Sequence, residues 1–409
     1  MLEILLKHMS SAIKYFIIIY LFLSSSILHA NGKENILKEF IKKNGFVSHK
    51  ELFNEKDSNL SEVGKKLFDS KSISLNGDIS CSTCHLDNKG SADGLPIAAA
   101  IGGSGEGIER FNSGAQLLPR NTLPFWGRGG IGFDTFFWDG KVQLKEGKVL
   151  SQFGSSPPSN DPFEVAVHLP AVQIREMLSD GMGVDKLKQE NVDLANVTYD
   201  IIAEKLKEYE KIASAKLAEV LRKRKNDLTF NDYSRSLAAF IRDKFRIRET
   251  KLEKFVNDKV SLSENELNGG LIFYGKGRCV TCHSGPYFSD FNFYSIPFPQ
   301  LGFGANGFGV DYGRYNITFD TNDLYKFRTP PLHNVEKTSP YGHDGSLSTL
   351  NEAIIAHFDP LRLIDINKMD AKKRHYFYQK LASSDSSVVN YLTDDEVDDL
   401  VYFLKLLSY

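Results

Sequence analysis

The sequence has little cysteine, little tryptophan and almost no net charge, and each shortage limits what the protein can be. Its four cysteines all fall within two short motifs, which leaves none for a disulfide or a free reactive thiol. Lysine and arginine number 50 against 52 aspartates and glutamates, so the net charge of −2 offers no argument for nucleic acid binding. A mean hydropathy of −0.29 is typical of an ordinary water-soluble protein.

The two cysteine motifs share the form Cys-x-x-Cys-His. Two thiols at this spacing can each bond one vinyl group of the same porphyrin, and the histidine then reaches the iron from beneath the ring. Two copies therefore predict two covalently bound c-type haems. The predicted thioether links are Cys81, Cys84, Cys279 and Cys282, and the predicted iron ligands are His85 for haem 1 and His283 for haem 2.

Two other interpretations of a cysteine pair are weaker here. A zinc ribbon usually brings its two pairs closer together in sequence than Cys84 and Cys279. A redox dithiol does not need the adjacent histidine, and both motifs carry one. The motifs therefore predict electron chemistry.

The only long apolar run covers residues 15–28, with two lysines before it and a small residue after it. This pattern is typical of a secretory signal, and the run is short for a spanning helix, which needs about 20 apolar residues. Covalent haem c attachment takes place outside the cytoplasm. We therefore predict a signal peptide over residues 1–30 and a periplasmic location, although Leu28 near the cleavage point leaves an uncleaved membrane anchor open.

The remaining chain is long enough for two or three domains of about 100–200 residues. We predict a mostly α fold with a polar leader over residues 31–58 and two cytochrome c-like haem domains, over residues 59–255 and 256–409. Residues 86–135 are rich in glycine and proline and predict long loops around haem 1. Helix starts are predicted near Ser61, Thr229, Ser263 and Thr393, the last two from capping boxes.

With these motifs in view, the chain resembles the bacterial diheme cytochrome c peroxidases and their MauG-type relatives from about residue 60 to the C-terminus. The matching strings besides the haem motifs are Asp93–Pro96, Pro119–Asn121, Phe137–Gly140, Phe240–Arg242 and Thr338–Gly345. The resemblance implies that haem 1 is the peroxide site, that haem 2 receives electrons, and that Trp138 bridges them. The other tryptophan, Trp126, is assigned to packing. The resemblance also implies a calcium ion between the domains, held by the Asn121 side chain and the carbonyls of Thr338 and Pro340.

The first departure from the family pattern concerns haem 1. Family members that need reductive activation carry a histidine in an Ile-Gly-His segment, where this chain reads Ile101-Gly102-Gly103. Glycine has no side chain with which to bind iron. We therefore expect His85 to be the only protein ligand of haem 1, which would react with peroxide without prior reduction.

The second departure concerns haem 2, whose sixth ligand in the family is a Met or Tyr sixteen residues after the Tyr matched by Tyr341. That position is His357 here, so bis-histidine ligation by His283 and His357 is expected, with a lower potential than a methionine ligand would give. The alternative is that His357 lies on a helix surface and Met369 is the ligand.

The third departure concerns proton transfer, because cleavage of bound peroxide needs a base within hydrogen-bond reach of both oxygens. The family uses a glutamate about twenty residues after the bridging Trp. Asp161–Glu164 resembles that segment after an insertion, which makes Glu164 the candidate base. The alternative is an ordinary solvent-facing glutamate at a helix start.

The leading hypothesis is a periplasmic peroxidase that reduces hydrogen peroxide to water with electrons from a small cytochrome c or similar carrier. One alternative is a MauG-type oxidase that modifies a partner protein. Such an enzyme would oxidise its partner through surface tryptophans, and this chain has only two tryptophans, which favours the peroxidase. Another is a diheme electron-transfer cytochrome, which would need both irons six-coordinate. Family members are often dimers, so a homodimer is left open.

Overall fold

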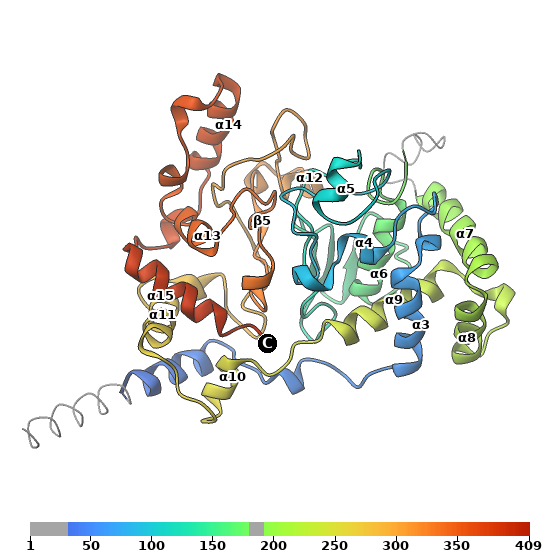
Figure 1. The fold of residues 1–409 in the computed structure, drawn as a ribbon, viewed down its shortest axis with the longest axis horizontal. Helices are drawn as coiled ribbons and strands as arrows, with labels where there is room; N and C mark the ends of the chain where they lie inside the picture. The colour runs from blue at the N-terminus through green and yellow to red at the C-terminus, as the bar shows by residue number, and fades with distance from the viewer. Residues whose placement is uncertain (1–31, 180–191) are drawn as a thin grey trace, which may run out of the picture.

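The computed structural model describes residues 32–179 and 192–409, which form two mostly helical lobes joined by long loops (Figure 1). The predicted mostly α fold is confirmed. The predicted signal peptide lies outside the described residues. Within the described ranges, no helix has the length and apolar character needed to cross a membrane.

The lobes are built from a helix over residues 32–43 and from the α-helices named here. They are α3 (Ser58–Asp69), α4 (Cys81–Cys84), α5 (Ile108–Asn112), α6 (Pro162–His168), α7 (Val192–Tyr209), α8 (Lys211–Leu221), α9 (Phe230–Lys244), α10 (Lys251–Val256), α11 (Glu264–Tyr274), α12 (Tyr315–Thr318), α13 (Leu350–Ala356), α14 (Ala371–Ala382) and α15 (Asp394–Lys405). Short 3-10 helices lie between them, among them η7 (Cys279–Thr281) and η12 (Ser386–Val388).

Strands are few and short. β1 (Thr135–Phe136), β2 (Val142–Lys145) and β3 (Lys148–Leu150) form an antiparallel sheet in that order, and β4 (Phe293–Tyr294) pairs antiparallel with β5 (Phe327–Arg328). Both sheets lie beside the loops that connect the lobes.

In the first lobe, α3 crosses α9 at a point where the two backbones nearly touch. A Cβ atom on Gly64 would lie 1.9 Å from the Ser236 carbonyl oxygen and 2.8 Å from Phe240 Cβ, so only glycine permits this approach. One turn further along α3, Phe68 packs on Phe240 with ring centroids 5.1 Å apart. The crossing therefore depends on a small residue followed by an aromatic pair.

The second lobe repeats this crossing with α11 and α15. A Cβ atom on Gly269 would lie 2.0 Å from the Asp399 carbonyl oxygen, and Phe273, one turn on, packs on Phe403 at 5.2 Å. The spacing from the glycine to the aromatic residue is the same in both lobes. The two lobes therefore share one helix-pair geometry, each beside its own haem motif.

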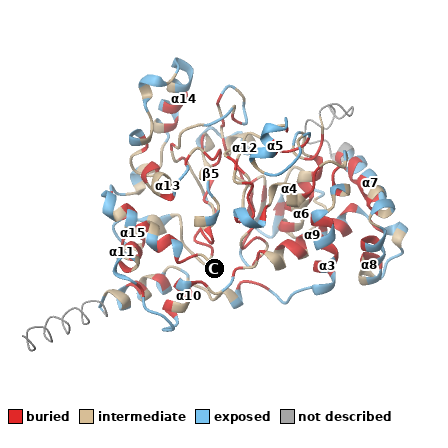
Figure 2. Ribbon diagram, in the orientation of Figure 1, coloured by how far each residue is buried: buried red, intermediate tan, exposed pale blue. Residues whose placement is uncertain are grey.

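Two large apolar cores match the lobes. One consists mainly of residues between 52 and 247, and the other of residues between 252 and 407 together with Leu37 and Ile41. Figure 2 shows exposed residues along the outer helices α7, α8 and α14. The predicted domain division near residue 255 stays a prediction.

The N-terminal segment runs along one edge of the molecule from the second lobe to the first (Figure 1). Leu37 and Ile41 lie in the second core, whereas Leu52 and Phe53 lie in the first. The segment predicted as a polar leader is therefore packed against both lobes in the part of it that the structure describes.

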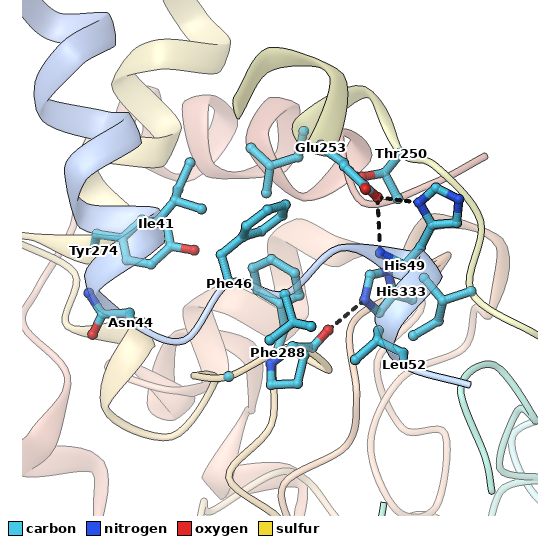
Figure 3. Close-up of a pocket in the computed structure, with 15 residues that line it drawn as sticks. Ile41, Asn44, Phe46, His49, Leu52, Thr250, Glu253, Tyr274, Phe288 and His333 are labelled. Atoms are coloured by element: carbon cyan, nitrogen blue, oxygen red, sulfur yellow. Dashed lines mark hydrogen bonds and ion pairs between the residues drawn. The ribbon is translucent and has the colours of Figure 1, made fainter. Parts of the chain in front are cut away.

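A small cavity lies where this segment crosses between the lobes (Figure 3). The buried carboxylate of Glu253, on α10, accepts hydrogen bonds from Ser48 Oγ at 2.7 Å and from His49 Nδ1 at 2.8 Å. On the same wall, His333 Nε2 bonds the Pro286 carbonyl at 3.0 Å. Glu253 thus fastens the crossing segment to α10.

Three of the predicted helix starts are confirmed and one is wrong. Thr229, Ser263 and Thr393 are N-caps with capping boxes at α9, α11 and α15. The start predicted near Ser61 is wrong because α3 begins at Ser58, where the Asp57 side chain accepts a hydrogen bond from the Leu60 amide.

We expect Gly269→Ala to lower the free energy of unfolding by about 1–3 kcal/mol, because the added methyl group forces α11 away from α15. Denaturant unfolding of the haem-loaded protein measures this. Gly32→Ala is the matched control, since nothing lies within 4 Å of a Cβ placed there. Equal unfolding midpoints for the two variants would contradict the proposed close contact.

Candidate haem sites

The first haem motif forms the short helix α4, which the Ser80 capping box starts and His85 ends. The His85 Nδ1 atom bonds the Ser91 carbonyl at 2.8 Å, which fixes the tautomer and leaves Nε2 for a metal. The ring stacks on Phe125 with centroids 3.8 Å apart. Burial, and then the nearby Arg128 charge, lower the pKa of His85 to about 3, so the imidazole is neutral as an iron ligand must be.

The second motif repeats this arrangement around η7. The His283 Nδ1 atom bonds the Phe288 carbonyl at 2.9 Å, and burial lowers the pKa of His283 to about 4. In both motifs a backbone carbonyl five or six residues later therefore presents the same nitrogen of the histidine to the iron.

A large, mainly apolar cavity with about 1640 Å³ of empty space, part of it open to solvent, contains the second motif. Cys279, Cys282 and His283 line it, and His357 lines it too. The rings of His283 and His357 have centroids 6.5 Å apart. Two metal–nitrogen bonds of about 2 Å each, plus the distance from each nitrogen to its ring centre, match this separation.

The contacts of His357 also orient its ring as a metal ligand would need. It ends α13, and its Nδ1 atom bonds the Ala353 carbonyl at 2.7 Å, which leaves Nε2 free in the part of the chain described. Met369 is not among the described residues that line this cavity. The residues present therefore fit a haem held between two histidines, and the arrangement favours His357 over Met369.

The cysteine pairs do not come together. Cys81 and Cys84 pack against the first core, whereas Cys279 packs against the second. No group of three or more metal-binding side chains gathers anywhere in residues 32–179 and 192–409. Burial raises the pKa of the Cys81 thiol to about 12. The zinc-ribbon interpretation, which needs all four sulfurs at one metal, is therefore excluded.

The loop that carries Gly103 is folded back on itself beside haem motif 1. The buried Arg110 side chain donates from Nε to the Ala100 carbonyl and from Nη1 to the Gly103 carbonyl, both at 2.7 Å. A Cβ atom on Gly103 would lie 2.6 Å from Ala115 Cβ, so position 103 has no room for a side chain as the loop stands. The loop is therefore fixed in a form that has no room for a histidine at position 103.

Trp138 lines the cavity of haem 2 and donates from Nε1 to the Asn121 carbonyl at 3.0 Å. The chain from Asn121 continues four residues to Phe125, whose ring stacks on His85. A short stretch of backbone therefore joins Trp138 to the ligand of haem 1. The geometry suits the bridging role implied by the resemblance.

The backbone carbonyls of the turn that carries Trp138 are bound from the second lobe. Each carbonyl of Phe137–Gly140 accepts a hydrogen bond from that lobe. Arg328 donates from Nε to Phe137 at 2.9 Å and from its backbone amide to Trp138 at 2.8 Å, while Arg314 Nη1 donates to Asp139 and Gly140 at 2.7 and 2.8 Å. We call Phe137–Gly140 the tryptophan turn.

A buried ion triad reinforces this contact. Arg120 donates to Asp139 at 2.6 Å and bidentately to Asp311 at 2.8 and 2.9 Å. Burial opposes ionisation of Asp311, but the Arg120 guanidinium dominates and holds the pKa of that carboxyl at about 2. Sequence reasoning missed Arg314, Arg328 and Asp311. The one signal was Arg328 itself, an isolated charge within the proline-containing stretch over residues 327–332.

Trp126 lies away from the tryptophan turn. Its Nε1 atom donates to the Gly90 carbonyl at 2.8 Å, and its ring packs edge-on against Phe245 and Tyr409 at 5.3 and 5.4 Å. Phe245 in turn packs on Phe125 at 5.4 Å. Trp126 thus packs in the core as expected, and it also joins a chain of rings that starts at haem motif 1.

The three expected calcium ligands lie together. Asn121, Thr338 and Pro340 all line the cavity of haem 2, and the Asn121 side-chain amide lies 2.7 Å from the Pro340 carbonyl oxygen. Here that contact is a direct hydrogen bond in which the amide donates. This contact joins an amide nitrogen to one carbonyl oxygen, so the calcium site stays a proposal.

Glu164 lies in the first turn of α6, whose N-cap is Asp161. Its carboxylate accepts a hydrogen bond from Ser159 Oγ at 2.6 Å, and Asp161 pairs with Arg242 at 2.5 Å. Glu164 is half-buried. The carboxylate is thus held in one orientation at a partly shielded position.

Comparisons with known proteins show which family the chain is similar to. The family profile described as di-haem cytochrome c peroxidase matches residues 58–261. The chain is 24% identical over 330 residues to a cytochrome-c peroxidase, IdrP2, of Denitromonas iodatirespirans, covering 73% of each chain. It is 26% identical over 304 residues to the methylamine utilization protein MauG of Methylorubrum extorquens, covering 72% of this chain and 67% of that one.

The fold is also similar to a solved structure. The diheme peroxidase BthA of Burkholderia thailandensis superposes with a TM-score of 0.62 at 19% identity, over 89% of each chain. At this identity the similarity concerns the fold alone.

We propose His357 as the sixth ligand of haem 2, and we expect His357→Met to raise the potential of that haem. The rise should be on the order of 0.1 V, within the roughly 0.8 V range that axial ligands span. Potentiometric titration measures it, and a methionine-type near-infrared band should appear in the oxidised spectrum. Met369→Leu is the control and should leave both unchanged. A wild-type protein that already shows the methionine band would overturn the assignment.

Proposed function

The chain belongs to the di-haem cytochrome c peroxidase and MauG family, and on that basis we propose that it is a periplasmic peroxidase. It reduces hydrogen peroxide to two waters, consuming two electrons from a small cytochrome c or similar carrier and two protons. The observation that supports this proposal is the loop around Gly103, which is pinned by Arg110 and has no room for a side chain at position 103, so this position supplies no ligand to haem 1.

When bound, haem 1 supplies the iron at which the peroxide bond is cleaved, and haem 2 supplies the iron that receives electrons. The residues of the chain would hold and orient the two haems. His85 and His283 each present Nε2 because a backbone carbonyl engages Nδ1. Trp138, fixed by Asn121 and by the second lobe, fills the space between the two sites.

Glu164 is the proposed acid–base group. Proton movement between the two peroxide oxygens needs a carboxylate that does not rotate freely, and the Ser159 hydroxyl restrains Glu164. The Asp161–Arg242 pair holds the start of α6 against α9, which fixes the backbone beneath Glu164.

A calcium ion between the lobes is part of the proposal. Asn121 would supply its side-chain oxygen after an amide flip, and Thr338 and Pro340 would supply backbone carbonyls. Asn121 also receives the Trp138 hydrogen bond. The ion would therefore stabilise the residue that positions the bridging tryptophan.

A second candidate function is oxidation of a partner protein, as in the MauG branch, and one observation favours it. Aromatic rings in contact run from His85 through Phe125, Phe245 and Trp126 to Tyr409, with successive centroids 3.8, 5.4, 5.3 and 5.4 Å apart. The last two residues of this chain of rings are the most readily oxidised side chains in it. The low number of tryptophans therefore argues less strongly against oxidation of a partner protein than the composition alone indicates.

We expect rapid oxidation of a reduced small cytochrome c by hydrogen peroxide when the protein is used fully oxidised, with no reductive pretreatment. The reason is that Gly103 provides no side-chain ligand for haem 1, so we expect the sixth position of that iron to be free at rest. Stopped-flow and steady-state absorbance measure the turnover. Peroxide consumption without cytochrome oxidation, together with oxidation products at Tyr409, would instead favour the second candidate. Haem-loaded protein inert towards peroxide would refute both.

We expect Glu164→Gln to lower kcat/KM for peroxide by about 10²–10⁴-fold, the usual contribution of a positioned acid–base group. The amide keeps the size of the side chain but cannot take up the proton. Glu62→Gln, at an exposed position of α3, is the matched control and should leave kcat/KM unchanged. Full activity of the Glu164→Gln variant would show that Glu164 is not the acid–base group.

A further inference from the structure

Two buried arginines near the meeting of the lobes have no carboxylate partner among the described residues. Arg128 is 7% exposed and Arg328 is 1% exposed. Arg120, whose side chain is 16% exposed, forms ion pairs with two aspartates. Arg110 is 3% exposed and is held by backbone carbonyls alone, away from the cavity of haem 2. Arg128 and Arg328 form no ion pair within the described chain, although a buried guanidinium is stabilised by a counter-charge.

Arg128 lies beside the ligand of haem 1. Its guanidinium carbon is 5.3 Å from the centroid of the Phe125 ring, and that ring stacks on His85. Its Nη2 atom is buried and has no hydrogen-bond partner in the described chain. The charge is thus placed next to the first haem site with part of its hydrogen-bonding capacity unused.

Arg328 lies at the cavity of haem 2. It lines the cavity together with His283, His357 and Trp138. Within the described chain, its side chain donates hydrogen bonds to the neutral carbonyls of Phe137 and Thr329, at 2.9 and 3.1 Å. Those bonds orient the guanidinium but do not neutralise it.

The two charges also repel each other. Burial, with a further contribution from Arg328, lowers the pKa of Arg128 to about 9, and burial lowers the pKa of Arg328 to about 10. Asp139 and Asp134 oppose this lowering for Arg328 from a distance, but neither forms an ion pair with it, so a directly bound anion would stabilise both charges. Each c-type haem brings two propionate carboxylates, and the guanidinium fork matches a carboxylate well.

We propose that Arg128 and Arg328 are counter-ions of the haem propionates, Arg128 serving haem 1 and Arg328 serving haem 2. The inference rests on the two haems of the proposed function. A nearby cation favours the reduced haem, because reduction removes one positive charge from the iron. Arg328 therefore raises the potential of haem 2 and offsets part of the lowering that bis-histidine ligation causes.

The test is potentiometric titration of both haems in Arg128→Met and Arg328→Met. Arg128→Met should lower the midpoint potential of haem 1 more than that of haem 2, and Arg328→Met should do the reverse. Resonance Raman bands of the propionates should shift in the same haem-selective way. The backbone hydrogen bond from Arg328 to Trp138 survives either substitution, so the tryptophan turn keeps one of its anchors.

Arg235→Met is the matched control, since Arg235 is exposed on α9, and it should move neither potential. Arg128→Lys and Arg328→Lys keep the charge and should restore most of the potential while still altering the propionate bands. If a methionine variant fails to fold, the lysine variant at the same position is measured in its place. Potentials equal to the control, or shifts of both haems alike, would overturn the inference. Absence of covalent haem would instead refute the proposed function.

Discussion

The hydrogen bonds to the carbonyls of Phe137–Gly140 are the contact on which the arrangement of the two sites depends. Four successive carbonyls of a first-lobe turn accept bonds from Arg314 and Arg328 of the second lobe. A turn exposes carbonyls that secondary structure cannot satisfy, so a buried turn needs donors from elsewhere. Here the donors come from the opposite lobe, so the backbone of the tryptophan turn is satisfied only when the lobes meet, while the Trp138 ring is also held by Asn121 of its own lobe.

The arginines near this contact are held in two different ways. Arg120 forms ion pairs with Asp139 and Asp311, and this ion triad is closed within the protein. Arg128 and Arg328 form no ion pair in the described chain, and one nitrogen of Arg128 has no hydrogen-bond partner there. This difference is the reason for assigning Arg128 and Arg328, and not Arg120, to the haem propionates in our proposal.

In both lobes, a pair of helices packs closely in the same way. A glycine lets α3 approach α9, and another lets α11 approach α15, with an aromatic pair one turn beyond each crossing. Each crossing supports one haem motif, and in each motif a later carbonyl fixes the histidine tautomer. The sites differ in one respect: the His357 ring lies 6.5 Å from the His283 ring, whereas the loop around Gly103 near the first motif is pinned by Arg110.

What the sequence determined by itself is local. The haem motifs, the capping boxes at Thr229, Ser263 and Thr393, and the mostly α fold depend on residues within one or two turns of each other, so their spacing is enough to predict them. The start of α3 was predicted wrongly because two nearby side chains could cap it, and only the observed bond from the Leu60 amide shows that Asp57 does.

Contacts between distant residues were decided by the tertiary structure alone. Arg328 bonds Phe137 across 191 positions, and Arg120 bonds Asp311 across the same separation. The sequence on either side of an arginine does not indicate which carbonyl or carboxylate the side chain will bind. The sequence could place Trp138 and His357 as candidates, and the folded chain decided what surrounds them, because burial and long-range hydrogen bonds exist only once the lobes have packed.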